Sequence, residues 1–292
     1  MKKKIVSIFL TVAMVMTFAT GCGAKAETAA VETEAAEVAA AEVESEAAET
    51  ETAETETAEA GSIDGALSGV TLKVGTDTSF VPFCFPDESN EYVGFDIDML
   101  KAFSEKLGFE YELSPMDFSA LLMSVQSEKL DVGLAGITIK PERQEVMDFS
   151  TPYYDAGLLI FVNKENTDIN SIEDLSGKVV AVKEGTASVD YVQEHVADVK
   201  ELKVFPNIEN AYLEVERGAA DAVVYDAPNI LYYLTINPES NGKAVGDMFD
   251  AAQYGIVFQK GSEYTELFNA ALEEFEEDGT YQEIYDKWFG AN

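Results

Sequence analysis

Hydrophobic residues between positions 70 and 289 recur in two patterns that alternate along the chain. Short apolar runs predict strands, and apolar residues three or four apart predict helices between them, as at Ile97, Leu100, Phe103 and Leu107. The predicted strands cover 70–76, 111–113, 130–135, 157–162, 178–182, 203–205, 222–224 and 254–258. Two successive strand–helix series predict two α/β lobes, each with a mainly parallel sheet flanked by helices.

Residues 1–22 have the pattern of an export signal. Three lysines at 2–4 precede a 14-residue apolar run, 5–18, which is too short to span a membrane comfortably. The run leads into Ala-Thr-Gly-Cys at 19–22, which resembles the lipobox of bacterial lipoproteins, although Leu is usual where Ala19 stands. The resemblance implies cleavage before Cys22 and a lipid on its thiol. An ordinary secretory signal is the alternative.

Residues 23–60 have the composition of a disordered acidic tether. Glu, Ala and Thr supply 32 of residues 24–60, and Lys25 is the only cation among them. Such a segment lacks the apolar side chains that a packed core needs. As a flexible chain it spans roughly 35 Å on average and about 120 Å when stretched, which holds the following domain away from a membrane.

Charge and composition exclude several classes of function. The 292 residues carry a formal charge of −36, and residues 61–292 keep −28 once the signal (+3) and the tether (−11) are set aside. A field of this sign repels phosphate backbones, so we expect no nucleic-acid binding. One histidine and two cysteines cannot form a His/Cys zinc cluster. We therefore expect no metal and no cofactor.

The sequence shows no catalytic motif. His195 is the only imidazole, and it lies in a polar stretch beside Glu194, as a surface histidine would. Neither a Gly-x-Ser-x-Gly elbow nor a phosphate-binding loop with a Gly-Lys pair is present. These absences favour a binding protein over an enzyme.

Two loops that follow predicted strands carry complementary charges. Gly136-Ile137-Thr138 leads to Arg143 in the first turn of a predicted helix, where a guanidinium, a hydroxyl and free backbone amides suit a carboxylate. Asp226 follows the strand at 222–224 and suits an ammonium. Ligands of α/β sheets bind at the carboxyl ends of strands, so the two loops together predict a site for an α-amino acid. A solvated helix face is the alternative for Arg143.

An ordered series of motifs resembles the polar amino-acid solute-binding proteins of ABC transporters. The series covers about residues 70–290 and consists of VGTDTSFVPF (74–83), VGFDID (93–98), AGIT (135–138) with Arg143, DFS (148–150), GTY (279–281) and KWF (287–289). Within that family, the glutamine-binding members are similar at PMDFS (115–119), VAVK (180–183) and FPNI (205–208). The resemblance implies a type II periplasmic-binding-protein-like fold.

The resemblance also implies how each end of an amino acid is held. The Gly136 carbonyl, Thr138 and Asp226 match the positions that hold the α-ammonium in this family. Arg143 and the amides of Thr138 and Ala187 match those that hold the α-carboxylate. Ala187 stands where the glutamine-binding members have Gly, which changes little if only its amide is used.

The remaining implied contacts concern the ligand side chain. Phe80 and Phe118 match the aromatic walls, and Tyr225 stands where the glutamine-binding members have His. Asp77 would accept a hydrogen bond from a side-chain amide, and Lys183 would donate one to its carbonyl. A glutamate side chain would be repelled by Asp77 and a basic one by Lys183, so the pair favours glutamine. An inter-lobe salt bridge without a role in selection is the alternative.

In this fold two crossing strands, expected near 153–157 and 250–254, join the lobes. The first lobe is expected at 70–153 plus 255–292 and the second at 157–250. A ligand bridging both lobes stabilises the closed form. We expect a monomer that is anchored outside the cytoplasm by its lipid and delivers its ligand to a separate membrane permease.

Enzymes and receptors with the same fold provide the competing interpretations. Cyclohexadienyl dehydratases, some lytic transglycosylases and sensory ectodomains resemble it. The complete amino-acid clamp argues against a dehydratase. The lack of a second catalytic domain after Asn292, and of a membrane helix with a kinase, argues against the other two.

Overall fold

The computed structural model describes residues 62–290, so the predicted signal (1–22), its Cys22 and the tether (23–60) lie outside the described residues. The strands are β1 (Thr71–Asp77), β2 (Phe85–Pro86), β3 (Tyr92–Val93), β4 (Glu110–Met116), β5 (Val132–Thr138), β6 (Met147–Phe149), β7 (Tyr154–Asn163), β8 (Val179–Lys183), β9 (Glu201–Phe205), β10 (Ala222–Asp226) and β11 (Gly242–Gln259). The helices are α1 (Phe95–Leu107), α2 (Phe118–Gln126), α3 (Pro141–Gln144), α4 (Ala187–His195), α5 (Ile208–Glu216), α6 (Ala227–Ile236), α7 (Thr265–Asp278) and α8 (Thr280–Phe289), with a short 3-10 turn η1 (Ile172–Leu175).

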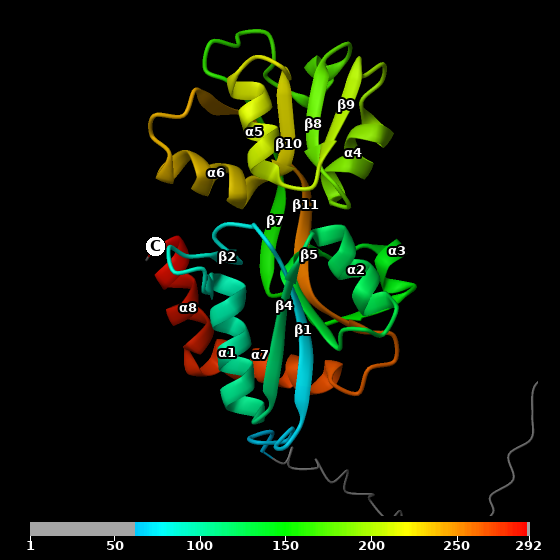
Figure 1. Ribbon diagram of the computed structural model, residues 1–292, viewed down its shortest axis with the longest axis vertical. Coiled ribbons are helices and arrows are strands. Elements are labelled where there is room, and N and C mark those ends of the chain that lie inside the picture. The colour runs from blue at the N-terminus through cyan, green and yellow to red at the C-terminus, as the bar shows by residue number, and fades with distance from the viewer. Residues whose placement is uncertain (1–61, 291–292) are drawn as a thin grey trace, which may run out of the picture. The chain divides into compact units, whose positions relative to one another are not determined.

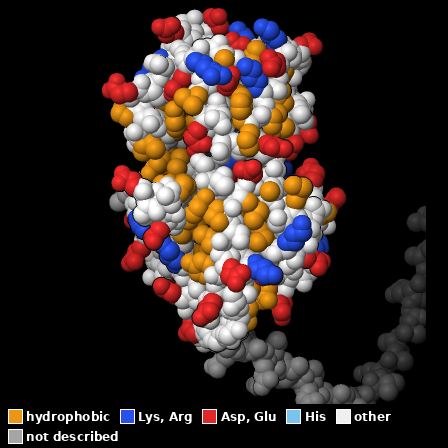
Figure 2. All heavy atoms as spheres, viewed as in Figure 1, with side chains coloured by type: hydrophobic (Ala, Val, Ile, Leu, Met, Phe, Trp, Pro, Cys, Tyr) orange, Lys and Arg blue, Asp and Glu red, His pale blue; other side chains and the backbone are white. Residues whose placement is uncertain are grey.

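Two lobes stand on either side of a waist, and two long strands run between them (Figure 1). The first lobe contains β1, β4 and β5 with α1, α2, α3, α7 and α8, and the second contains β8, β9 and β10 with α4, α5 and α6. This is the two-lobed α/β fold of periplasmic binding proteins. Acidic side chains are spread over both lobes on the face shown in Figure 2.

The sheets of the two lobes are joined into one hydrogen-bonded path. Its strand order is β4-β1-β5-β11-β7-β10-β8-β9, and β6 pairs with β11. Within each lobe β1 pairs in parallel with β4 and β5, and β8 pairs in parallel with β9 and β10. The antiparallel pair β7–β11 carries the chain across the waist, with Tyr254 opposite Tyr154 and Ala252 opposite Ala156. Because both strands belong to both lobes, the residue limits expected for the lobes stay a prediction.

Burial on both faces of the sheet explains the apolar runs in the sequence. Along β7, Leu158, Ile160 and Val162 pack into one hydrophobic cluster, whereas Leu159 and Phe161 point to the other face and join the second. Alternation of this kind follows from the two-residue period of a strand. Helices cover both faces, so neither set of side chains meets water.

The sequence pattern locates eight of the strands but shortens most of them. β7 starts at Tyr154 rather than at 157, and β5 ends at Thr138 rather than at 135. β11 begins at Gly242 rather than at the predicted 254, and β4 runs from Glu110 to Met116 rather than over 111–113. The added part of β11 mixes apolar with polar and glycine residues in no regular alternation and is half-exposed or exposed for most of its length, and its register shifts between Val245 and Ala252. Local hydrophobicity therefore gives little signal there, and pairing with β7 decides the conformation.

Candidate functional site

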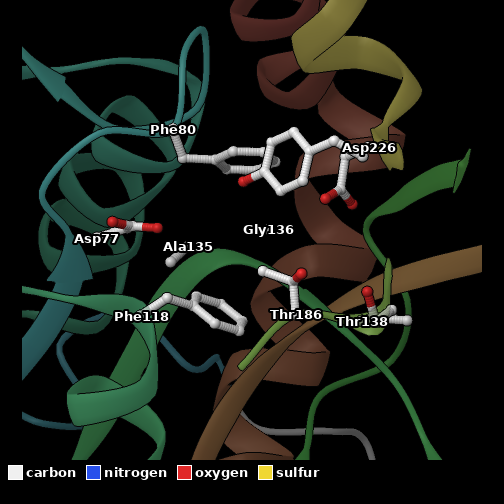
Figure 3. A pocket seen from close by; sticks show the side chains of 10 residues that line it. Asp77, Phe80, Phe118, Ala135, Gly136, Thr138, Thr186 and Asp226 are labelled. Atoms are coloured by element: carbon white, nitrogen blue, oxygen red, sulfur yellow. The ribbon is translucent and has the colours of Figure 1, made fainter. Parts of the chain in front are cut away.

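A cavity lies between the lobes at the carboxyl ends of β1, β5, β8 and β10. Its lining combines aromatic, small and charged residues: Asp77, Phe80, Phe118, Ala135, Gly136, Thr138, Thr186, Ala187, Tyr225 and Asp226. In Figure 3, Phe80 and Phe118 lie on opposite sides, Asp77 lies toward one end, and Thr138 and Asp226 lie toward the other. Eight of the ten residues expected from the sequence therefore line one cavity, and Arg143 and Lys183 contact its lining.

Asp77 and Lys183 form a buried ion pair between the lobes. Asp77 ends β1 and Lys183 ends β8, and their side chains are 2% and 0% exposed. Lys183 Nζ donates to Asp77 Oδ2 and, at 3.2 Å, to the Ser79 carbonyl. The amide of Ser79 donates to Asp77 Oδ1 at 3.2 Å. The pair removes the net charge from this end of the cavity.

The ion pair keeps some hydrogen-bonding capacity. An ammonium has three N–H donors, and within residues 62–290 Lys183 uses two of them. A carboxylate has about four acceptor sites, and Asp77 uses up to three, one for Lys183 and two for the Ser79 amide and the Thr78 hydroxyl. One donor of Lys183 and one acceptor of Asp77 thus have no partner within residues 62–290, and a primary amide is a group that can use both.

Arg143 reaches the opposite end from the short helix α3. Its guanidinium donates to the Thr138 carbonyl at 2.8 Å and to the Gly185 carbonyl of the second lobe at 3.0 Å. The group also lies over the Phe118 ring, with 5.6 Å between Cζ and the ring centre. Burial lowers the pKa of Arg143, but a guanidinium remains charged. Three N–H donors are left for a carboxylate once the two carbonyls are satisfied.

The N-terminus of α4 meets the same end of the cavity. Ala187 is its first residue and is buried, and Thr186 stands at the cap position. The Thr186 hydroxyl is engaged with the Lys183 carbonyl at 2.8 Å and the Ser188 hydroxyl at 2.7 Å, so it does not cap the helix. The first amides of α4, with the positive end of the helix dipole, are thus available to an anion.

Asp226 is a buried carboxylate at the end of β10 and is 7% exposed. Within the described residues no Lys, Arg or His nitrogen lies within 4.0 Å of it, and its Oδ1 accepts a 2.5 Å hydrogen bond from the Tyr254 hydroxyl. Burial raises the pKa of Asp226 to about 6, and the Tyr254 bond and the charges of Lys183 and Arg143 oppose that rise. A ligand ammonium would supply the missing positive charge.

Aromatic rings set the width of the cavity. Phe80 packs edge-on against Tyr225, with ring centres 6.0 Å apart, and both residues are 2% exposed. Phe80 also presses on Gly136, where a Cβ would lie 2.2 Å from its Cε1 and where φ is +54°. Glycine is therefore required at 136 for steric and conformational reasons. Burial raises the pKa of Tyr225 well above its usual range, so the phenol stays neutral.

Four residues that shape the site were not predicted from the sequence. Ala135 and Thr186 line the cavity: Ala135 lies within β5, directly before Gly136, and Thr186 directly precedes Ala187 at the start of α4. Asp96 and Tyr254 lie behind it and bond to Gly136 and Asp226. Asp96 belongs to the VGFDID motif, but the local sequence does not reveal the partner of either residue, because each bonds to a residue far away in the chain.

The lobes are closed over the cavity. The volume open to the centre of a water molecule is about 10 Å³, close to that of a single water site. Three further bonds cross between the lobes: Ser79 to Glu209, Asn229 to the Val81 carbonyl at 2.7 Å, and Lys140 to Asp190 at 3.0 Å. Entry or exit of a ligand therefore requires the lobes to separate about β7 and β11.

No group of three or more His, Cys, Asp or Glu side chains within residues 62–290 has an arrangement that could hold a metal ion. No helix in this range is long and apolar enough to cross a membrane. His195 is exposed and stacks on Tyr191, away from the cavity.

The fold and the charged cavity define a class, that of two-lobed proteins that enclose a small zwitterionic ligand. Comparison with known proteins agrees with this class. Residues 72–291 match the bacterial extracellular solute-binding proteins, family 3. The arginine-binding extracellular protein ArtP of Bacillus subtilis (strain 168) is 34% identical over 75% of this chain and 86% of its own. The chain belongs to family 3 of the bacterial extracellular solute-binding proteins.

Solved structures extend the comparison. An ancestral arginine-binding protein bound to glutamine superimposes with a TM-score of 0.73 at 47% identity, over 76% of this chain and 98% of its own. The ancestral amino acid-binding protein AncCDT-1, a precursor of cyclohexadienyl dehydratase, superimposes with a TM-score of 0.68 at 38% identity. This match covers 75% of this chain and 95% of that protein.

Proposed function

We propose that this protein is an extracytoplasmic lipoprotein that captures a polar amino acid, with L-glutamine as its main ligand, and delivers it to the permease of an ABC importer. One observation carries the amino-acid part. Arg143 and Asp226 lie at the same end of the cavity, and within the described residues neither has an oppositely charged partner within 4.0 Å. An α-carboxylate and an α-ammonium satisfy both charges at once, and uncompensated buried charges are costly.

The Asp77–Lys183 pair supports a neutral polar side chain. It closes the other end of the cavity with no net charge, and it leaves one donor and one acceptor for the ligand. Glutamine uses both, whereas alanine or serine leaves them unpaired at a cost of about 1–3 kcal/mol per group. Glutamate and arginine each meet one like charge.

Arginine is the second candidate ligand. ArtP is an arginine-binding protein, and the ancestral arginine-binding protein has been crystallised with glutamine. Glu209 accepts a hydrogen bond from Ser79 near the Asp77 end, which adds a second carboxylate to that region. A guanidinium would be favoured there if Lys183 turned away from the cavity.

Calorimetry of the protein, freed of carried-over ligand by unfolding and refolding, tests the proposal against all twenty amino acids. Glutamine is expected to bind most tightly. Tightest binding of arginine would disprove the glutamine assignment and leave the amino-acid function intact. Absence of amino-acid binding together with turnover of prephenate or arogenate would replace the proposal with the enzymatic alternative that AncCDT-1 represents.

Delivery to a permease and lipid anchoring rest on the family and on the sequence of residues 19–22. The proposed order of events is export, lipidation at Cys22, capture by lobe closure and docking of the closed form. A monomer suffices for this cycle, because the cavity is formed by one chain alone.

A further inference from the structure

Tyr254 connects the strands of the waist to the cavity. It lies in β11, opposite Tyr154 of β7 and opposite Thr138 of β5, and its side chain is completely buried. Its carbonyl accepts a hydrogen bond from the Tyr153 amide at 2.9 Å. Tyr254 thus belongs to one of the two strands that join the lobes. It pairs with the other of these strands and with the end of β5 that lines the site.

The aromatic surroundings hold the Tyr254 ring in one orientation. The ring stacks on Tyr154, with centres 5.7 Å apart and planes at 16°. Phe83 and Phe80 meet it edge-on at 5.5 and 6.1 Å. A ring packed on several sides directs its hydroxyl to one place, and that place is Asp226 Oδ1 at 2.5 Å.

Asp226 needs such a partner, because within the described residues no other side chain bonds to its carboxylate. Asp226 occupies the cap position of α6, yet its side chain makes no cap hydrogen bond. The carboxylate is turned instead toward Tyr254 and the cavity. A charge-assisted hydrogen bond is about twice as strong as a neutral one, so a single bond suffices to fix the carboxylate.

From this geometry we propose that Tyr254 is a positioning residue, which holds the ammonium-binding carboxylate of Asp226 in place and ties it to the strands about which the lobes close. The inference rests on the proposed function, since it assumes that Asp226 receives the α-ammonium. Tyr254 acts on the part of the ligand that all amino acids share. Removal of the Tyr254 hydroxyl is therefore expected to lower the affinity for every amino acid by the same factor.

Tyr254→Phe removes the hydroxyl and keeps the ring. We expect glutamine and a second amino acid that binds to lose affinity by a common factor of about ten or more, which is 1.4 kcal/mol per tenfold. Tyr154→Phe is the matched control, because Tyr154 lies opposite Tyr254 and its hydroxyl makes no hydrogen bond within residues 62–290. It is expected to bind within about twofold of the wild type. Equal affinities of the two variants would overturn the proposal.

The pH dependence of binding separates positioning from a loss of packing. The groups that face Asp226 are Lys183 of β8, Arg143 of α3, Tyr212 of α5, Tyr225 of β10 and Tyr254 of β11. Of these, only Tyr254 bonds to it within the described residues, and this bond lowers the pKa of Asp226. The pH below which glutamine binding weakens should therefore rise in Tyr254→Phe and stay unchanged in Tyr154→Phe. An unchanged midpoint in Tyr254→Phe contradicts the proposal.

A double-mutant cycle identifies which assumption fails. If Tyr254 acts through Asp226, then Asp226→Asn/Tyr254→Phe binds no more weakly than Asp226→Asn alone. A further tenfold loss in the double variant would show an independent role for Tyr254. Wild-type affinity in Asp226→Asn would disprove the ammonium assignment and this inference with it, whereas a defect in Asp226→Asn with none in Tyr254→Phe overturns the inference alone. Should Asp226→Asn bind too weakly to measure, the pH midpoint of Tyr254→Phe decides.

Discussion

The carboxylate of Asp96 accepts a 2.8 Å hydrogen bond from the amide of Gly136, 40 residues further along the chain. Its second oxygen accepts a 2.9 Å bond from the Tyr153 hydroxyl, and Asp96 is fully buried. Asp96 thus links the first turn of α1 to the strand end that lines the cavity and to the residue before β7. The left-handed backbone at Gly136 is held from behind by this carboxylate and from the front by Phe80.

Asp96→Asn is expected to remove a stability cost that grows with pH. Burial raises the pKa of Asp96 from 3.8 to about 7, against the lowering effect of the Tyr153 and Gly136 bonds. The folded state therefore binds this proton more tightly than the unfolded state, and the wild type loses stability as pH rises from about 4 to 7. Asn keeps an acceptor for Gly136 and can donate to the Tyr153 oxygen. In urea unfolding, the free energy of unfolding of the variant minus that of the wild type should increase by about 1.4 kcal/mol per pH unit between pH 5 and 7. A pH-independent difference would contradict this.

Arg143→Ala is expected to weaken binding of every amino acid, by about 100-fold or more. The guanidinium is placed to take the shared α-carboxylate, and removing one partner of a desolvated charge pair costs about 3–5 kcal/mol. Calorimetry with glutamine, alanine and serine measures the effect. Arg217→Ala is a suitable control, because Arg217 is exposed and pairs with Glu214 away from the cavity. Normal binding in Arg143→Ala would place the carboxylate clamp elsewhere.

Lys183→Met is expected to change selectivity rather than abolish binding. It removes the donor for a side-chain amide and leaves the buried Asp77 without a counter-charge. The affinity for glutamine should fall more than the affinity for alanine or serine. The affinity for arginine should rise relative to that for glutamine. Asp77→Asn/Lys183→Met serves as the control, because it removes both charges and with them the attraction for arginine. An equal loss for all ligands would identify the pair as purely structural.

Gly136→Ala is expected to lower the affinity for every ligand by about tenfold or more and to displace Phe80. The added Cβ collides with Phe80 in a backbone conformation that costs a non-glycine residue about 1–2 kcal/mol. Gly261→Ala is the matched control, since φ there is +77° and no atom lies within 4 Å of the added Cβ. It should lose stability to a similar strain and keep its affinity. A shared binding defect would point to global destabilisation instead.

Cys22→Ser is expected to move the protein from the membrane fraction to the soluble fraction of the producing cell. The prediction rests on the small residues that precede Cys22 at the end of the apolar run. Fractionation followed by immunodetection measures it, and the cleaved length of the variant serves as the control for export. Continued membrane association of a cleaved variant would show that a lipid on Cys22 is not the anchor.

The strands and loops that carry the site could be predicted from the sequence. Strand periodicity and apolar runs located the carboxyl ends of β1, β5, β8 and β10, because a buried strand must be apolar on both faces. Arg143 could be singled out from its position in the first turn of a predicted helix that follows the strand-end loop at 136–138. Asp77 and Asp226 line the cavity and stand at the ends of strands, so their positions relative to the predicted strands were enough to find them.

Which of these charges meet depends on the tertiary structure and could not be predicted from the sequence. Lys183 and Asp77 are 106 residues apart and pair because the lobes close, whereas Arg143 and Asp226 approach the same end of the cavity and remain without counter-charges in the described residues. The start of β11 depends on pairing with β7, and Tyr254 and Asp96 depend on residues 28 and 40 positions away. The physical reason is the same in each case: hydrogen-bond and charge partners are selected by distance in space, and a local sequence pattern carries no information on that distance.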